Sequence, residues 1–116
     1  MANHSNILIV DDDKKYAEEI ARQLHEADHA CTVTMTVDDA VHLLRTHDYD
    51  ILLVNIAIDD GNGREAVSAA NEAKRPPQVI AITASSSAAE AVQVMQLGAL
   101  TYLQKPFAMR ELQNVV

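Results

Sequence analysis

Several polar residues in this chain are of types that could do chemistry together. The run Asp11-Asp12-Asp13 supplies carboxylates, and it directly follows a short apolar stretch. Asn55, Thr83 and Lys105 add an amide, a hydroxyl and an ammonium, each at or near the end of another apolar stretch. Crowded carboxylates need a cation, because like charges at close range disfavour their joint ionisation. Oxygen ligands suit Mg²⁺, while a hydroxyl and an ammonium can hold phosphoryl oxygens. These residue types predict a Mg²⁺-dependent phosphoryl site in which position 55 would receive the phosphoryl group.

The elements between these residues must bring them to one place. Short continuous apolar runs, typical of strands buried on both faces, alternate with segments in which apolar residues recur at helical spacing. The expected strands are 6–10, 31–37, 51–54, 79–83 and 100–103. The expected helices are 14–28, a second that runs to about residue 46, 64–74, 88–97 and 107–116. Asp13 is the expected cap of the first helix, and Asp38 or Asp39 that of the second. Five strand–helix repeats predict a parallel sheet between helices, whose carboxyl-end edge would collect the polar residues above.

Each of these polar groups also has a simpler interpretation. The aspartate run can be an ordinary acidic helix entry, and Asn55 can be a turn former. Thr83 can be a β-branched strand residue, and Lys105 can be a solvated loop charge beside Pro106. Their joint placement at four predicted strand ends favours the site over the separate explanations.

Length and composition limit the class of protein. The 116 residues make one domain, and 48% hydrophobic residues favour a folded one. The net charge of −8 argues against nucleic acid or an anionic membrane as a direct partner. No signal peptide or membrane segment is visible, and the single Cys31 fits a reducing compartment, so we expect a cytoplasmic domain. The five histidines lack metal-ligand spacing and are expected at the surface.

Five segments of the chain resemble the receiver domain of bacterial two-component response regulators. They are ILIVDDD (7–13), YDILLVN (49–55), DGNG (60–63), ITA (82–84) and GALTYLQKPF (98–107). The resemblance covers essentially the whole chain, and the order and spacing of all five segments make it highly specific. It implies an α/β fold of the doubly wound (βα)₅, flavodoxin-like kind, a sandwich with a five-stranded parallel sheet.

The resemblance also implies a metal site and a switch. Mg²⁺ would be held by Asp12 directly, by Asp11 through water, by residue 55 and by the carbonyl of Ala57. Thr83 would bond the phosphoryl group, and Lys105 would pair with its charge. Tyr102 stands at the aromatic switch position, where the family's ring turns inward on phosphorylation.

Asn55 departs from the family, which has its phosphorylated aspartate at this position. A carboxylate attacks phosphorus as an anionic oxygen, whereas an amide is nearly non-nucleophilic and uncharged. We therefore expect no normal phosphorylation, no enzymatic activity, a weakened Mg²⁺ site and a Lys105 without its anionic partner. Val54 and Ile56 offer no substitute nucleophile, and Asp59 is a carboxylate where the family usually has proline. Because the other site residues are intact, an engineered change is favoured over a natural loss.

Three functions are open on the sequence. The first is a receiver held in the unphosphorylated state, whose partners would be a sensor histidine kinase or phosphotransfer protein and an output domain. The output domain would use the face of the fourth helix, fifth strand and fifth helix, with Val92, Met95, Ala99 and Tyr102. The second is a natural pseudo-receiver that binds proteins independently of phosphorylation. The third and least favoured is a small metal-dependent phosphatase or phosphotransferase with the aspartate run as its nucleophile motif.

The predicted last helix stops at Val116 without a cap. In the family this helix generally runs about a turn further and leads into an output domain. We therefore expect residues 1–116 to be a receiver domain excised from a longer response regulator, with a short stand-alone regulator as the alternative.

Overall fold

Five strands and five helices alternate along the chain, as the sequence predicts. The computed structural model describes residues 5–56, 63–83, 88–105, 107 and 109–115. The strands are β1 (Asn6–Val10), β2 (Ala30–Thr34), β3 (Ile51–Asn55), β4 (Gln78–Thr83) and β5 (Thr101–Gln104). The helices are α1 (Lys14–Glu26), α2 (Val37–Thr46), α3 (Gly63–Glu72), α4 (Ala88–Gln96) and α5 (Met109–Val115). Among the described residues, no helix is long and apolar enough to cross a membrane.

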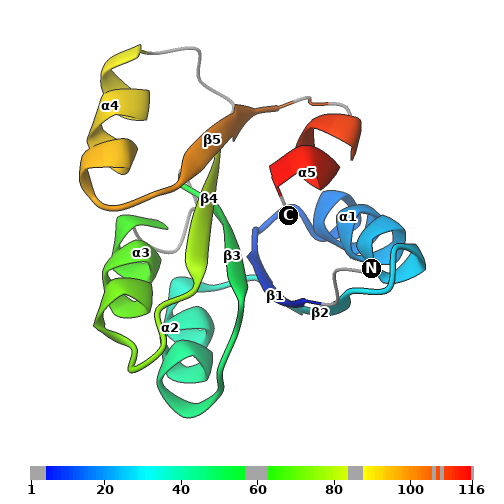
Figure 1. The fold of residues 1–116 in the computed structure, drawn as a ribbon, viewed down its shortest axis with the longest axis horizontal. Coiled ribbons are helices and arrows are strands. Elements are labelled where there is room, and N and C mark those ends of the chain that lie inside the picture. Colours follow the sequence, from blue (N-terminus) through cyan, green and yellow to red (C-terminus); the bar gives the residue numbers. More distant parts are fainter. Residues whose placement is uncertain (1–4, 57–62, 84–87, 106, 108, 116) are drawn as a thin grey trace.

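All five strands lie parallel in one sheet of order β2-β1-β3-β4-β5 (Figure 1). The strand order reverses beside β1, so the carboxyl ends of β1 and β3 flank the position where such sheets bind ligands. The register places Val10 opposite Val54 and Asn55 opposite Ile82. Asp11, which follows Val10, therefore comes next to Asn55 at the end of the neighbouring strand.

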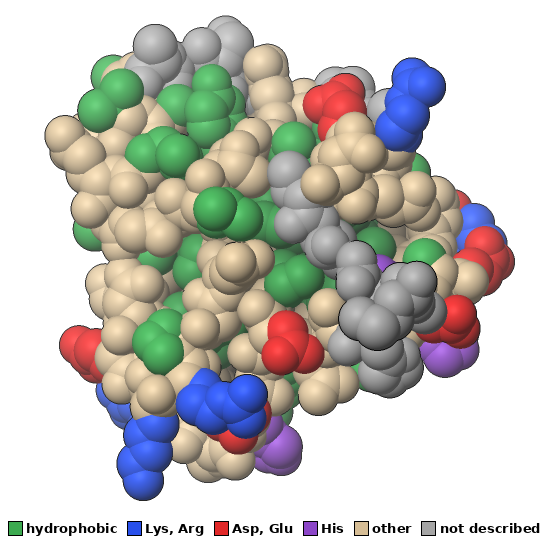
Figure 2. All heavy atoms as spheres, in the orientation of Figure 1, with side chains coloured by type: hydrophobic (Ala, Val, Ile, Leu, Met, Phe, Trp, Pro, Cys, Tyr) green, Lys and Arg blue, Asp and Glu red, His purple; other side chains and the backbone are tan. Residues whose placement is uncertain are grey.

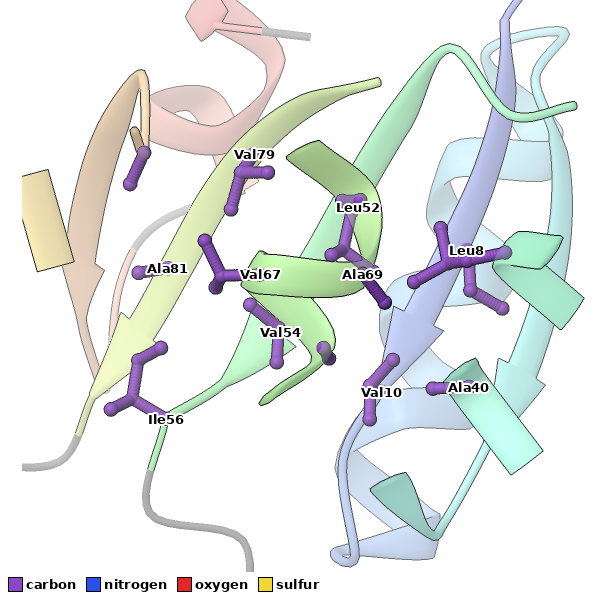
Figure 3. Close-up of a cluster of buried hydrophobic side chains, with 14 of the residues drawn as sticks. Leu8, Val10, Ala40, Leu52, Val54, Ile56, Val67, Ala69, Val79 and Ala81 are labelled. Carbon is purple, nitrogen blue, oxygen red and sulfur yellow. The ribbon is translucent and has the colours of Figure 1, made fainter. Parts of the chain in front are cut away.

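Helices cover both faces of the sheet, which confirms the doubly wound α/β fold (Figure 1). Alternate residues of each strand point to opposite faces. One face buries an aliphatic core against α2, α3 and α4, partly drawn in Figure 3, with Leu8, Val10, Leu52, Val54, Val79 and Ala81 from the strands. The other face packs on α1 and α5, with Ile7, Ile9, Leu53, Ile80 and Ile82 from the strands. Each fully buried aliphatic side chain contributes about 2 kcal/mol, so the strands near the site are firmly held.

The caps of the first two helices differ in how well the sequence predicts them. Asp13 caps α1 as expected, and its side chain accepts a hydrogen bond from the backbone N–H of Tyr16. The cap of α2 is Thr36, which accepts from the backbone N–H of Asp39, so the assignment to Asp38 or Asp39 is wrong. Both aspartates instead lie in the first turn, where negative charge favours the helix dipole.

One histidine departs from the expected surface location. His29 is buried, while His25, His42 and His47 are exposed. Nδ1 of His29 accepts a hydrogen bond from the backbone N–H of Ser5, 3.2 Å away. The ring lies where β1 and β2 begin, so it stabilises the sheet edge opposite to the predicted site.

Candidate functional site

The ends of β1 and β3 place two predicted site residues in direct contact. Nδ2 of Asn55 donates a hydrogen bond to Oδ1 of Asp11 at 3.2 Å. Both side chains are buried, with exposed fractions of 1% for Asp11 and 9% for Asn55. The contact therefore lies in a region of low dielectric, where an uncompensated carboxylate charge would be costly.

Lys105 supplies the positive charge that this carboxylate needs. Its Nζ lies 2.7 Å from Oδ2 of Asp11, and its side chain is only 17% exposed. The expectation that Lys105 has no anionic partner when position 55 is Asn is therefore wrong, because Asp11 takes that place. The backbone N–H of Lys105 also donates to the carbonyl of Thr83 at 2.7 Å, which fixes the start of this connection.

Aromatic rings hold the ammonium group from the side of α1. Nζ of Lys105 lies 4.2 Å from the ring centroid of Tyr16, a cation–π contact. Phe107 packs edge-on against Tyr16, with ring centroids 6.0 Å apart. Burial, followed by the negative charges of Asp11 and Asp13, raises the pKa of the Tyr16 phenol. The chain after β5 thus folds back over α1, which brings a lysine from the end of β5 to the end of β1.

The carboxylate of Asp11 has donors on both oxygens. Oδ1 accepts from the Asp13 backbone N–H at 3.0 Å as well as from the Asn55 amide, and Oδ2 accepts from Lys105. Among the described residues, no buried side-chain nitrogen or oxygen lacks a hydrogen-bond partner. The buried carboxylate of Asp11 is therefore fully hydrogen-bonded by groups of the chain itself.

These residues do not fit Mg²⁺ as they are arranged. Asp11 and Asp12 are oxygen ligands of the right kind, but the ion requires near-octahedral oxygen coordination at about 2.0–2.1 Å. An ammonium group already lies against Oδ2 of Asp11, and Asn55 presents its NH₂ group to Oδ1. No group of three or more His, Cys, Asp or Glu in the described part of the chain is placed to hold a metal ion. Ala57 and Asp59, which also bear on the predicted site, lie outside the described residues.

The backbone of α3 closes tightly over the end of β3. The first residue of this helix, Gly63, donates its N–H to the carbonyl of Ile56. A Cβ atom at Gly63 would lie 2.6 Å from the backbone oxygen of Asn55 and 2.8 Å from Cα of Ile56. Only glycine permits this approach, a requirement that the sequence prediction missed; the DGNG segment was its only signal.

Thr83 and Tyr102 lie to the other side of Asn55, on β4 and β5. Thr83 is buried at the end of β4, whereas Tyr102 is exposed on β5. Both border a small apolar gap that Ala91 and Val94 of α4 also line. The structure thus joins Asp11, Asn55 and Lys105 directly and places the predicted switch ring at the surface.

Exposed apolar side chains gather over α4 and β5. The members of this α4–β5 apolar face are Val92, Met95, Leu100 and Tyr102. Figure 2 shows hydrophobic side chains over this part of the molecule, towards the upper left. The prediction of Ala99 on the face is wrong, because Ala99 is buried, and Leu100 was missed. A one-residue error in the start of β5, which begins at Thr101, accounts for the exchange.

A parallel five-stranded α/β sandwich with acid, amide and lysine at its carboxyl edge defines a receiver-like domain. The sequence model of the response regulator receiver domain matches residues 7–116, and the chain belongs to this family. The transcriptional regulatory protein CusR of Escherichia coli K12 is 34% identical over 106 residues, covering 91% of this chain and 47% of CusR. RegA of Rhodobacter capsulatus, a photosynthetic apparatus regulatory protein, is 24% identical over 116 residues, which make up 63% of RegA. The chain therefore spans about half to under two thirds of the length of these relatives.

Solved structures agree with this assignment. The receiver domain of the Francisella response regulator 1452 superimposes with a TM-score of 0.85 at 27% identity, covering 93% of this chain and 89% of that one. A CheY-like receiver domain protein from Methanospirillum hungatei reaches a TM-score of 0.90 at 23% identity, over 97% of this chain and 90% of that one, and shows the shared fold. Receiver domains of response regulators generally bind Mg²⁺ and interact with histidine kinases and output domains.

Proposed function

We propose that this domain is a receiver whose phosphoacceptor position is occupied by Asn55, so that it stays in the unphosphorylated state. The observation that supports this most is the contact between Asn55 and Asp11. The side chain at the end of β3 donates an N–H to the carboxylate, at the place where the family's chemistry needs an anionic oxygen. An amide nitrogen or oxygen there has neither the charge nor the nucleophilicity to accept a phosphoryl group.

The partners follow from the family. A sensor histidine kinase or phosphotransfer protein would dock near the site without transferring a phosphoryl group. An output domain would bind across α4, β5 and α5, where the α4–β5 apolar face offers unpaired hydrophobic surface. Without a phosphoryl group for Thr83 to bond, Tyr102 would keep its exposed position. The domain would act in the cytoplasm, without enzymatic turnover and without direct contacts to nucleic acid or membrane.

Mg²⁺ binding by this chain would be weaker than in receivers with a carboxylate at position 55. Asp11, Asp12 and an oxygen of residue 55, with the carbonyl of Ala57, are the ligands that the family supplies. With Asn55, the site has one negative charge fewer, so its total electrostatic attraction for a divalent cation is smaller.

The proposal is tested by intact mass after incubation with acetyl phosphate and MgCl₂. We expect the unchanged chain to gain nothing and the Asn55→Asp variant to gain one phosphoryl group. Asn114→Asp, which adds a carboxylate at an exposed position of α5, is the matched control and should not react. A phosphorylated unchanged chain, or an inert Asn55→Asp variant, would contradict the proposal.

A second candidate is a pseudo-receiver that binds proteins without any phosphorylation control. The α4–β5 apolar face favours this candidate, because it is exposed while the domain is unphosphorylated. The two candidates differ in the behaviour of Asn55→Asp. A locked receiver regains phosphorylation and then changes its affinity for its output domain, whereas a pseudo-receiver binds its partner equally well in both forms.

A further inference from the structure

We propose that Lys105 is the resident cation of this site and keeps divalent metal ions away from Asp11. The inference rests on the proposed receiver site, but it does not depend on the phosphorylation state of the domain. Receivers generally bind Mg²⁺, and this chain places the ammonium group of Lys105 against Asp11, a carboxylate that would share in holding the ion. The positive charge that balances the buried carboxylate is thus covalently part of the protein.

The ion pair is placed where its interaction is strong. Nζ of Lys105 and Oδ2 of Asp11 are 2.7 Å apart, and the carboxylate is almost completely buried. Attraction between opposite charges grows as the local dielectric falls, and so does the cost of separating them. A metal ion would have to displace the ammonium or bind beside it, and two cations at one carboxylate oxygen repel each other.

Because residue 55 is an amide, the site needs no positive charge beyond that of Lys105. The NH₂ group of Asn55 donates a hydrogen bond to Oδ1 of Asp11, which also accepts one from the backbone N–H of Asp13. A carboxylate at position 55 would repel Asp11 at this distance and would require additional positive charge. With the amide, the contact is attractive, and one ammonium matches one buried carboxylate. With an amide at position 55, no metal ion is needed to balance a second carboxylate, and the ammonium group of Lys105 balances the charge of Asp11.

Aromatic packing holds the lysine in this role. The ammonium group lies over the ring of Tyr16, and the edge of Phe107 supports that ring. The backbone of Lys105 is bonded to the carbonyl of Thr83 at the end of β4. Entry of a metal ion would therefore break the contact with Tyr16 as well as the ion pair, so the lysine competes more effectively than a freely moving surface lysine would.

The test is the response of unfolding to Mg²⁺ in variants of Lys105, measured without any phosphodonor. We expect the denaturation midpoint of the unchanged chain to be the same in EDTA and in millimolar MgCl₂. Lys105→Met should have a lower midpoint in EDTA, which MgCl₂ raises, and calorimetry should show Mg²⁺ affinity increased about tenfold or more, because the uncompensated carboxylate is then free to bind the ion. Lys74→Met makes the same charge change at an exposed position just after α3 and should show neither effect.

A Lys105→Gln variant and the side-chain amide resonances of Asn55 give two further tests of Mg²⁺ exclusion. If Lys105→Met fails to fold in EDTA, Lys105→Gln retains a donor and is titrated instead, with the same expected gain of Mg²⁺ affinity. In the unchanged chain, the side-chain amide resonances of Asn55 should stay in place as MgCl₂ is added. Movement of those resonances at millimolar Mg²⁺, or the same Mg²⁺ affinity in the unchanged chain and in both lysine variants, would overturn the inference. Neither result bears on whether Asn55→Asp accepts a phosphoryl group, so the two proposals fail separately.

Discussion

Lys105 and Asp11 form an ion pair of 2.7 Å although 94 positions separate them in the chain. The pair ties the connection after β5 to the end of β1, across the carboxyl edge of the sheet. Asn55 completes it by donating to the other carboxylate oxygen. Asp11, Asn55 and Lys105 of this receiver domain are thus bound together through the Asp11 carboxylate.

A second carboxylate beside Asp11 should make the fold depend on Mg²⁺. Asn55→Asp removes a donor and places like charges in the contact that now measures 3.2 Å, so we expect a loss of roughly 1–3 kcal/mol in EDTA. MgCl₂ should recover most of this loss. Urea unfolding measures both values, and Asn114→Asp on exposed α5 should change stability by less than about 0.5 kcal/mol. Equal stability of Asn55→Asp and the unchanged chain in EDTA would show that the contact is energetically unimportant.

The ring of Tyr16 should stabilise the ammonium group of Lys105. A double-mutant cycle with Tyr16→Leu and Lys105→Met should give a coupling free energy of about 0.5–1 kcal/mol, from the 4.2 Å cation–π contact. Tyr49→Leu is the control. Tyr49 precedes β3, at the sheet edge opposite to Lys105, and its ring lies near that of His47. Its coupling to Lys105→Met should be close to zero. A Tyr16 coupling no larger than that of Tyr49 would rule out the stabilising contact.

The close approach of α3 to β3 should make Gly63 intolerant of any side chain. Gly63→Ala forces a Cβ atom to within 2.6 Å of the backbone oxygen of Asn55, so the helix must shift. We expect a loss of about 3 kcal/mol, at the upper end of overpacking effects. Ser68→Ala, at an exposed position of the same helix, should change the unfolding free energy by less than about 0.5 kcal/mol. Similar losses for the two variants would contradict the tight contact.

The only cysteine should be unreactive in the folded protein. Burial raises the pKa of the Cys31 thiol to about 11, and the thiolate is the form that alkylating reagents attack. At pH 8, iodoacetamide should label the folded protein on the order of 100-fold more slowly than the unfolded one, with the rate rising towards pH 11. The folded state holds this proton more tightly than the unfolded state does. Its contribution to stability is therefore present below about pH 8.5 and is lost as the pH rises through about 11. Equal labelling rates at pH 8 would contradict the raised pKa.

The parts of the site that depend on strand order were predictable from the sequence. Continuous apolar runs identify β1 and β3, and parallel pairing then brings Asp11 and Asn55 to one edge. The contact between their side chains follows from the register of Val10 with Val54. Local patterns suffice here because the strand ends themselves carry the polar residues.

The parts that depend on the path of a connection were not predictable in this way. The partner of Lys105 is set by how the chain after β5 folds back over Tyr16, which no local pattern encodes. Thr36 and Asp38 are both good capping residue types, so backbone geometry alone decides between them. Leu100 precedes the short strand β5, where an error of one residue exchanges the buried and exposed positions.

Position 55 alone separates this chain from a working phosphoacceptor in the function proposed above. Peptide-level mass mapping after treatment with acetyl phosphate and MgCl₂ examines this residue directly, in the unchanged chain and in Asn55→Asp. We predict one phosphoryl group in Asn55→Asp, on the peptide that contains residue 55 and removable by hydroxylamine, and none in the unchanged chain. A phosphoryl group on the unchanged chain, or one at another carboxylate such as Asp59 in the variant, would contradict the account.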